Sequence, residues 1–178
     1  MPQPWETHKI GWLLNRFGAG LPGFAALALV ASPAAAQVVS AHGEWAALKF
    51  GERCEARSRA VLQRRGAPPA IVGFAFDPRG PLQGRFYARL SRVPRAGSSA
   101  ILTIGNQPFL LAASGQWAWG RDWRQDAAIA AAARQAGSMR VESRDAGGRR
   151  FVNRYLLSGA ATAVDAAAAA CAQAGKAR

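Results

Sequence analysis

Apolar and polar side chains alternate most regularly between residues 84 and 92, in the segment GRFYARLSR. Phe86, Ala88 and Leu90 each stand between more polar neighbours. A period of two residues is typical of a strand that buries one of its faces. The segment therefore predicts a strand with one face in the core and the other in contact with solvent.

Other short apolar runs, separated by glycine and proline, predict further strands. Trp45 is expected to anchor the core from the first of them. The pairs Gly105-Asn106 and Gly147-Gly148 each predict a hairpin, because these residue types accept a positive φ. Residues 53–63 fit a strand or a helix equally well. The further expected strands lie within residues 43–50, 70–76, 100–113, 117–120 and 139–157.

Two segments late in the chain have the composition of helices. In residues 122–136, Asp122 can cap the first turn together with Gln125, three positions later, and Gly137 can end the helix. Residues 159–174 contain no proline and are rich in alanine, the best helix former. A helix is therefore predicted for each segment.

The second of these helices has a face of small side chains. Ser158 can cap its first turn with the hydroxyl group. Such a face buries little area, but it allows the helix backbone to lie close to a sheet. At helical spacing the face is expected to consist of Leu157, Ala161, Val164, Ala168 and Cys171.

Many short strands followed by two helices predict an α+β fold, with a mainly antiparallel β-sheet or sandwich and the helices packed on it. An all-β fold with short helices is the nearest alternative.

The first 36 residues have the three-part pattern of a signal peptide. Basic side chains precede an apolar run from Phe17 to Val30, and Ala34 and Ala36 stand where signal peptidase recognises small residues. Cleavage is expected between Ala36 and Gln37, with export to the periplasm, the cell surface or the medium. A retained N-terminal anchor is the alternative, although the apolar run is shorter than the roughly 20 residues that span a bilayer.

Residues 37–178 are then expected to form one β-rich domain without a transmembrane span, closed by the alanine-rich helix. They contain 21 basic and 9 acidic side chains, a net charge of +12. Such an excess attracts anionic surfaces and polymers, among them lipopolysaccharide, acidic lipids and acidic glycans. Arginine richness beside alanine richness is also typical of a compositional bias.

Cys54 and Cys171 stand near opposite ends of this domain. In an exported protein two cysteines allow a single intramolecular bridge, and we expect that disulfide. Closing a loop of this length stabilises a fold by roughly 4–5 kcal/mol in the chain-entropy model. Buried free thiols, or a bond between two chains, are the alternatives.

The sequence offers little catalytic chemistry. His42 is the single histidine after the leader, and with two distant cysteines it does not complete a zinc site of the usual ligand types. The sequence has no phosphate-binding loop, no dinucleotide fingerprint and no G-x-S-x-G motif. We therefore expect no metal, no cofactor and no enzymatic activity. A hydrolase with its site near residues 117–123 is the alternative.

Arg85, Tyr87 and Arg89 are expected to project from the polar face of one strand, with the arginines about 13 Å apart. Basic groups on either side of an aromatic ring can hold an acidic or phosphorylated ligand. An ordinary solvated strand face is the alternative. The segment is also similar to an RNA-binding strand motif, but export makes a nucleic-acid partner unexpected.

Trp117, Trp119 and Trp123 fall within seven residues. They are candidates for an aromatic patch that stacks on sugars or contacts a membrane. Packing in the core is the alternative, because tryptophan dominates the cores of small domains.

The chain resembles the invasion associated locus B family of exported bacterial proteins. The leader, the opening GEWAALKFGERC, the segment LTIGNQPFLL and the block MRVESRDAGGRRFVNRYLLSGAATAVDAAAAAC carry the resemblance, which covers most of residues 43–171. The middle of this chain lacks the additional cysteines that family members commonly have. The resemblance implies a periplasmic or surface β-rich protein with an envelope function and, in some relatives, a role in host-cell interaction.

The expected function is that of a non-enzymatic, envelope-associated protein that binds an envelope or protein partner. The alternative is a cationic module that binds anionic polymers such as lipopolysaccharide or acidic glycans.

Overall fold

The computed structural model describes residues 36–63, 65–66, 68–80 and 82–176. Residues 1–35 of the expected signal peptide lie outside these ranges. Strands and helices follow one another in the order β1 (Gln37–His42), β2 (Trp45–Phe50), β3 (Arg53–Arg59), β4 (Ile71–Phe76), β5 (Gln83–Arg89), β6 (Ala100–Ile104), β7 (Gln107–Ser114), β8 (Trp117–Trp119), α1 (Trp123–Ala133), β9 (Ser138–Arg144), β10 (Arg150–Leu156) and α2 (Ala160–Lys176).

The ten strands form one sheet in the order β1-β2-β3-β4-β5-β8-β7-β6-β9-β10. All neighbouring strands are antiparallel. Together with the two late helices, this arrangement confirms the predicted α+β class. Of the two predicted arrangements, a sheet or a sandwich, the described residues form the single sheet.

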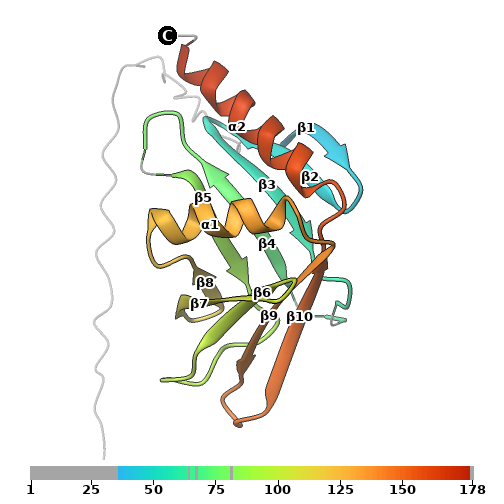
Figure 1. The fold of residues 1–178 in the computed structure, drawn as a ribbon, viewed down its shortest axis with the longest axis vertical. Coiled ribbons are helices and arrows are strands. Elements are labelled where there is room, and N and C mark those ends of the chain that lie inside the picture. The colour runs from blue at the N-terminus through green and yellow to red at the C-terminus, as the bar shows by residue number, and fades with distance from the viewer. Residues whose placement is uncertain (1–35, 64, 67, 81, 177–178) are drawn as a thin grey trace, which may run out of the picture. The chain divides into compact units, whose positions relative to one another are not determined.

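The sheet curls, so that the end of β10 meets the turn between β1 and β2 (Figure 1). The indole Nε1 of Trp45 donates a hydrogen bond of 2.9 Å to the carbonyl oxygen of Leu156. The backbone N–H of Glu44 donates to the carbonyl oxygen of Ser158 over 3.1 Å. These bonds satisfy polar groups at the junction of the two ends of the sheet.

Two glycines allow the chain to pass this junction. Gly43 and Gly159 have φ of +53° and +85°, a conformation that favours glycine. A Cβ atom on Gly43 would lie 2.5 Å from the carbonyl oxygen of Ser158. One on Gly159 would overlap with the carbonyl oxygen of His42.

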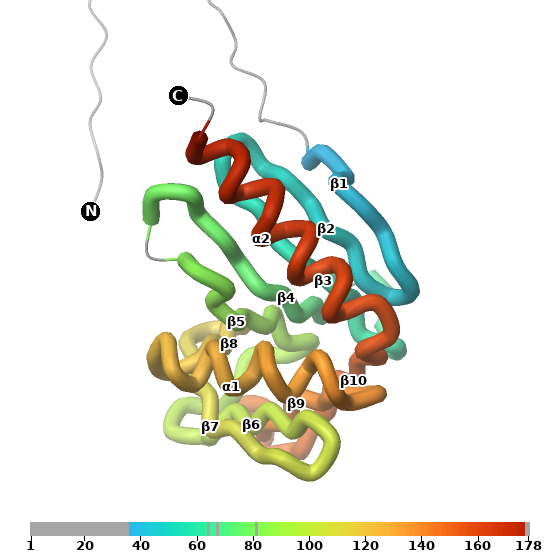
Figure 2. The backbone as a smooth tube through the Cα atoms, turned by 45° about the horizontal axis from the view of Figure 1, so that its top comes forward, coloured from blue at the N-terminus to red at the C-terminus, as the bar shows by residue number. Residues whose placement is uncertain are grey.

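Alternation along the strands gives the sheet an inner face, which carries the core, and an outer face. Phe86 and Ala88 of β5 are fully buried on the inner face, as predicted, and so is Leu90 just beyond the strand. Trp45 anchors the core as expected: its ring lies 6.1 Å from that of Phe74 between centroids. Both helices pack on this inner face, α2 across β1–β3 and α1 across β5 (Figure 2).

Helix α1 begins as predicted. Asp122 is its N-cap, and its side chain accepts a 2.8 Å hydrogen bond from the backbone N–H of Gln125. The amide oxygen of Gln125 accepts in return from the N–H of Arg121 over 2.8 Å. The helix ends at Ala133, three residues before the expected end, and a turn follows it.

Asp126 connects α1 to strand β5 through a hydrogen bond. It is almost fully buried, and its Oδ1 atom accepts a 3.2 Å hydrogen bond from the backbone N–H of Phe86. Burial raises the pKa of this carboxyl above its ordinary value, and the bond from Phe86 partly offsets the increase. A side chain on Gly120 would overlap with Asp126, so glycine is needed for this close approach.

Helix α2 differs from the prediction in its rotation. Ala161 and Ala168 of the expected face are only half buried. Because alanine occupies every side of the helix, the sequence does not specify which side faces the sheet. Packing on the sheet determines the rotation of the helix. The buried residues of α2 are Ala160, Ala163, Val164, Ala167 and Cys171.

The chain has two tyrosines, and one of them lies in the core. Tyr155 on β10 is fully buried, and its hydroxyl has no hydrogen-bond partner among the described residues. Burial without a compensating bond raises the pKa of this phenol.

Candidate ligand-binding groove

The outer face of the sheet carries a groove of about 580 Å³ that extends from the β1–β2 hairpin to β8. We call it the outer groove. Cationic, aliphatic and aromatic side chains from five strands, β2, β3, β4, β5 and β8, line it together. They include Leu48, Arg57, Arg59, Ile71, Arg89 and Trp117.

A charged network lies beside the groove. Glu55 is 7% exposed, and its Oε2 atom accepts a 2.7 Å hydrogen bond from Arg57 and a 2.5 Å hydrogen bond from the hydroxyl of Tyr87. The Nε atom of Arg57 also donates to this hydroxyl over 3.2 Å. Each group therefore has two partners within the network, as a half-buried ion pair requires.

Burial and the neighbouring charge of Glu55 raise the pKa of the Tyr87 phenol, so the hydroxyl stays a donor. For Arg57, burial opposes the charged form, but Tyr87 and Glu55 outweigh it and the pKa is raised. The guanidinium is also placed over the ring of Phe50, 5.1 Å from its centroid. The guanidinium of Arg57 therefore stays charged, and the phenol of Tyr87 stays protonated.

Gly73 makes this network possible. The register pairs Gly73 of β4 with Arg57 of β3 on one side and with Tyr87 of β5 on the other. A Cβ atom on Gly73 would lie 2.6 Å from the hydroxyl of Tyr87. The phenol therefore crosses β4 in the space that the missing side chain leaves, and reaches Glu55.

Two further arginines give the groove its charge. Arg89 donates to the carbonyl oxygen of Pro69 through Nε and a terminal nitrogen, over 3.1 and 2.6 Å, which holds its guanidinium at the groove. Arg59 is exposed. Neither makes an ion pair with a carboxylate in the part of the chain that the structure describes. Trp117, 44% exposed, lies beside Arg89 in the sheet register and 6.1 Å from the ring of Tyr87.

The structure separates the predicted anion-binding residues. Arg89 lines the groove, and the hydroxyl of Tyr87 is engaged by Glu55. Arg85 donates to the carbonyl oxygen of Gly120 over 3.3 Å and does not line the groove. The face that was expected to contact solvent is half buried, and the ring of Trp117 on the neighbouring strand β8 lies against Tyr87 on this face.

The three tryptophans of the predicted aromatic patch also lie in different surroundings. Trp117 is part of the groove, and Trp119 lies next to Tyr87 in the register and is half buried. Trp123 starts helix α1, is 73% exposed and has the guanidinium of Arg124 over its ring. It does not line the groove.

Sequence reasoning missed the contribution of β3. Arg53, Glu55, Arg57 and Arg59 alternate with small or apolar residues, so a strand would place all four on one face. The ambiguity of residues 53–63 between strand and helix concealed that pattern.

The two cysteines lie side by side where α2 packs on β3. Cys54 of β3 and Cys171 of α2 are both buried and approach within 2.6 Å, and both are free cysteines in this structure. Burial, followed by the hydrogen bond with Cys171, raises the pKa of the Cys54 thiol to about 12, so the reduced form is protonated at neutral pH. The disulfide itself stays a prediction.

Among the described residues, no group of three or more His, Cys, Asp or Glu side chains could hold a metal ion. No helix in the same residues has the length and apolar character to cross a membrane. His42 is exposed at the end of β1.

Comparison with family models, with curated proteins and with solved structures finds no match to this chain. The resemblance to the invasion associated locus B family therefore depends on the sequence motifs alone.

Proposed function

We propose that this protein is an exported, envelope-associated binding protein without catalytic activity, and that the outer groove holds an anionic envelope polymer such as lipopolysaccharide or an acidic glycan. The observation that carries this proposal is the composition of the groove, where three arginines lie together with an exposed tryptophan.

The chemistry of the groove fits an acidic sugar chain. A guanidinium binds carboxylate and phosphate groups through paired N–H donors. Arg57 shares its charge with Glu55, whereas Arg59 and Arg89 keep theirs for a ligand. The indole of Trp117 offers an apolar surface on which a sugar ring can stack. The aliphatic floor at Leu48 and Ile71 adds contact area without competing charge.

Export is the part of the proposal that the sequence supports. The leader has the basic, apolar and small-residue regions of a signal peptide. A pair of cysteines that lie side by side suits an oxidising compartment. The resemblance to invasion associated locus B proteins agrees with a periplasmic or surface location.

Titration of the purified protein with lipopolysaccharide and with an acidic glycan tests the function. We expect Arg59→Gln combined with Arg89→Gln to weaken binding about tenfold, since each arginine contributes charge-assisted hydrogen bonds. Trp117→Ala should weaken it as well. Binding should also fall steeply with salt. The matched controls are Arg124→Gln and Trp123→Ala, which change an exposed arginine and an exposed tryptophan outside the groove. Equal losses in the groove variants and the controls would contradict the proposal.

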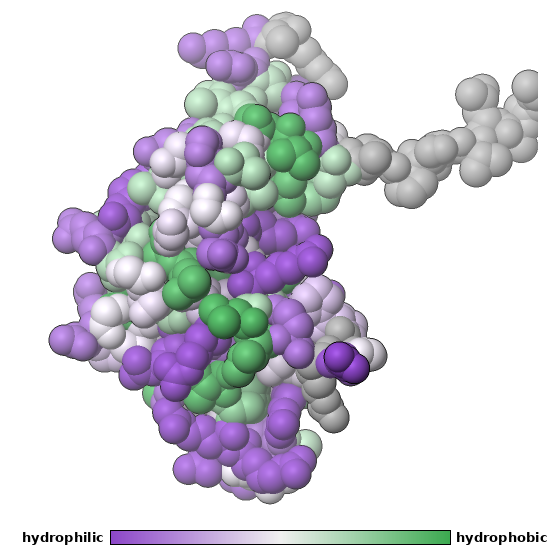
Figure 3. Space-filling view, turned by 90° about the vertical axis from the view of Figure 1, so that its right-hand side faces the viewer, coloured by the Kyte–Doolittle hydropathy of each residue, from purple (hydrophilic) through white to green (hydrophobic). Residues whose placement is uncertain are grey.

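A protein partner is the second candidate, favoured by exposed apolar side chains at the ends of the sheet. Val38 and Val39 on β1, Leu156 on β10, and Val61 and Leu62 after β3 are all exposed. The side of the molecule toward β1 and β10 has apolar patches among hydrophilic side chains (Figure 3). Capture of one defined envelope protein, abolished by Leu62→Ser and unaffected by the groove variants, would favour this candidate.

A further inference from the structure

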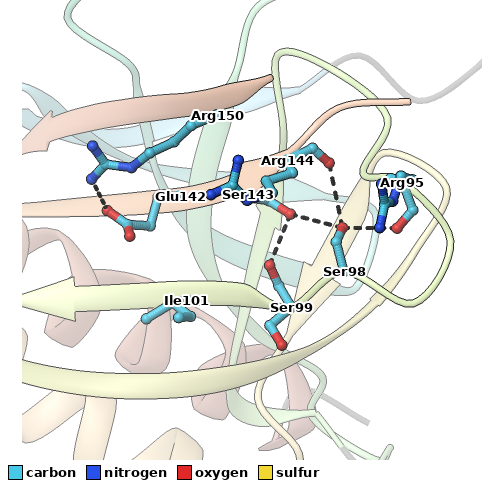
Figure 4. Close-up of a pocket in the computed structure, with 8 residues that line it drawn as sticks. All are labelled: Arg95, Ser98, Ser99, Ile101, Glu142, Ser143, Arg144 and Arg150. Carbon is cyan, nitrogen blue, oxygen red and sulfur yellow. Dashed lines mark hydrogen bonds and ion pairs between the residues drawn. The ribbon is translucent and has the colours of Figure 1, made fainter. Parts of the chain in front are cut away.

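A second pocket, of about 390 Å³, lies at the far end of the β9–β10 hairpin, where the segment between β5 and β6 packs against β9 (Figure 4). Two arginines, three serines and an isoleucine form most of its wall: Arg95, Ser98, Ser99, Ile101, Ser143 and Arg144. Glu142 and Arg150, which pair with each other, complete the lining.

The wall of this pocket is held in place before any ligand arrives. The backbone N–H of Arg95 donates to the carbonyl oxygen of Arg144 over 2.8 Å, so the backbones of the two arginines are held side by side. The hydroxyl of Ser143 donates to the carbonyl oxygen of Ser99 over 2.8 Å, and the hydroxyl of Ser98 lies 3.3 Å from that of Ser143 (Figure 4). These bonds join the segment to β9.

The two carboxylates near this pocket, Glu142 and Asp145, are already paired with arginines. Glu142 accepts a 2.7 Å hydrogen bond from Arg150, and Arg140 lies 3.6 Å away. The bond from Arg150 is the main reason that the pKa of Glu142 is lowered. Asp145 pairs in the same way with Arg92 and Arg149, over 2.6 and 3.5 Å. Each acid therefore has two arginine partners.

Arg95 and Arg144 remain without a carboxylate partner in the described ranges, and they lie beside the same glycine. A terminal nitrogen of Arg144 donates to the carbonyl oxygen of Gly148 over 3.0 Å. A terminal nitrogen of Arg95 lies 3.9 Å from the position that a Cβ on Gly148 would take. Both guanidinium groups therefore lie near Gly148, and both residues line the pocket, so an anion bound between them would reduce their repulsion.

We propose that Arg95 and Arg144 bind a phosphomonoester group in this pocket. At neutral pH such a group has a charge of about −1.5 to −2 and three terminal oxygens, which matches two guanidinium groups better than a single carboxylate does. Ile101 provides an apolar contact for the carbon atoms that carry the phosphate. This site does not depend on the outer groove or on the function proposed for it.

The test is a titration of the full chain with sn-glycerol 3-phosphate and with phosphatidylcholine vesicles that contain phosphatidic acid. Saturable binding of the soluble probe assigns a free phosphomonoester, and binding of the vesicles alone assigns a lipid headgroup. We expect the double variant Arg95→Gln/Arg144→Gln to lose at least about tenfold in affinity for whichever probe binds. Its circular dichroism and thermal midpoint should match those of the parent protein.

Arg149→Gln is the matched control, because it removes the same charge from the same hairpin outside the pocket. We expect its affinity to stay within about twofold of that of the parent. Three results overturn the proposal: no saturable binding of either probe, an equal loss in Arg149→Gln, or equally tight binding of succinate in place of the phosphate. A double variant that does not fold is replaced by the single variants Arg95→Gln and Arg144→Gln, each of which should lose affinity.

Discussion

The hydroxyl of Tyr87 lies 2.5 Å from Oε2 of Glu55, two strands away, and reaches it across Gly73 of the strand between them. Three neighbouring strands are thereby connected through side chains as well as through their backbones.

Tyr87→Phe should lower the free energy of unfolding by about 1.5–3 kcal/mol, the range for a hydrogen bond to a charged group. The substitution removes one partner of Glu55 and one of Arg57 and leaves the ring in place. Urea denaturation of the variant and the parent measures the difference. A loss below about 0.5 kcal/mol would show that water replaces the hydroxyl in the network.

The same substitution at the other tyrosine, Tyr155→Phe, should not destabilise the fold. Tyr155→Phe removes a buried hydroxyl that has no partner among the described residues, and we expect the stability to be unchanged or increased by up to about 1 kcal/mol. The two variants are matched, since each deletes one oxygen from a phenol. A loss as large as that of Tyr87→Phe would mean that the hydroxyl of Tyr155 has a partner in solution.

Cys54 and Cys171 should form a disulfide when the protein is produced in an oxidising compartment. Intact mass of the native protein, with and without reductant, should then differ by two hydrogens. Reduction should lower the free energy of unfolding by up to about 4 kcal/mol, because the unfolded chain regains the freedom of a long loop. The double variant Cys54→Ser/Cys171→Ser should be insensitive to reductant. Native protein in which both thiols react with an alkylating reagent would disprove the bond.

Asp126 should make stability depend on pH. Because its pKa in the folded protein is raised above the ordinary value of 3.8, ionisation favours the unfolded chain as the pH rises through that window. Asp126→Asn keeps an oxygen acceptor for the N–H of Phe86 and has no charge to bury. Its stability relative to the parent should therefore increase between about pH 3 and about pH 7, measured by urea denaturation.

Asp126→Ala is the control for this experiment. It removes the acceptor as well as the charge, so we expect a loss of about 1–3 kcal/mol from the unpaired N–H of Phe86. If the difference between Asp126→Asn and the parent is the same at both pH values, the carboxyl does not titrate in the expected direction.

The sequence predicted those features whose cause is local. The alternation in residues 84–92 identified β5, the pair Gly105-Asn106 identified a hairpin, and Asp122 with Gln125 identified the start of α1. Each of these depends on residues within a few positions of one another.

Features that depend on distant strands escaped prediction. Strand β1, Gln37–His42, was not expected, because its exposed side chains show no alternation and its pairing with β2 defines it. The network of Glu55 and Tyr87 depends on the register of β3, β4 and β5, which places Gly73 between them. Likewise, the rotation of α2 depends on the sheet beneath it.

The junction between Gly43 and Gly159 has a consequence for biosynthesis. A ribosome adds Leu156, which accepts the hydrogen bond of Trp45, 111 positions after the indole itself. During most of translation β2 can pair with β3, but the indole N–H of Trp45 has no carbonyl group of Leu156 to bind. The hydrogen bonds that join the two ends of the sheet can therefore form only after nearly the whole chain has been synthesised.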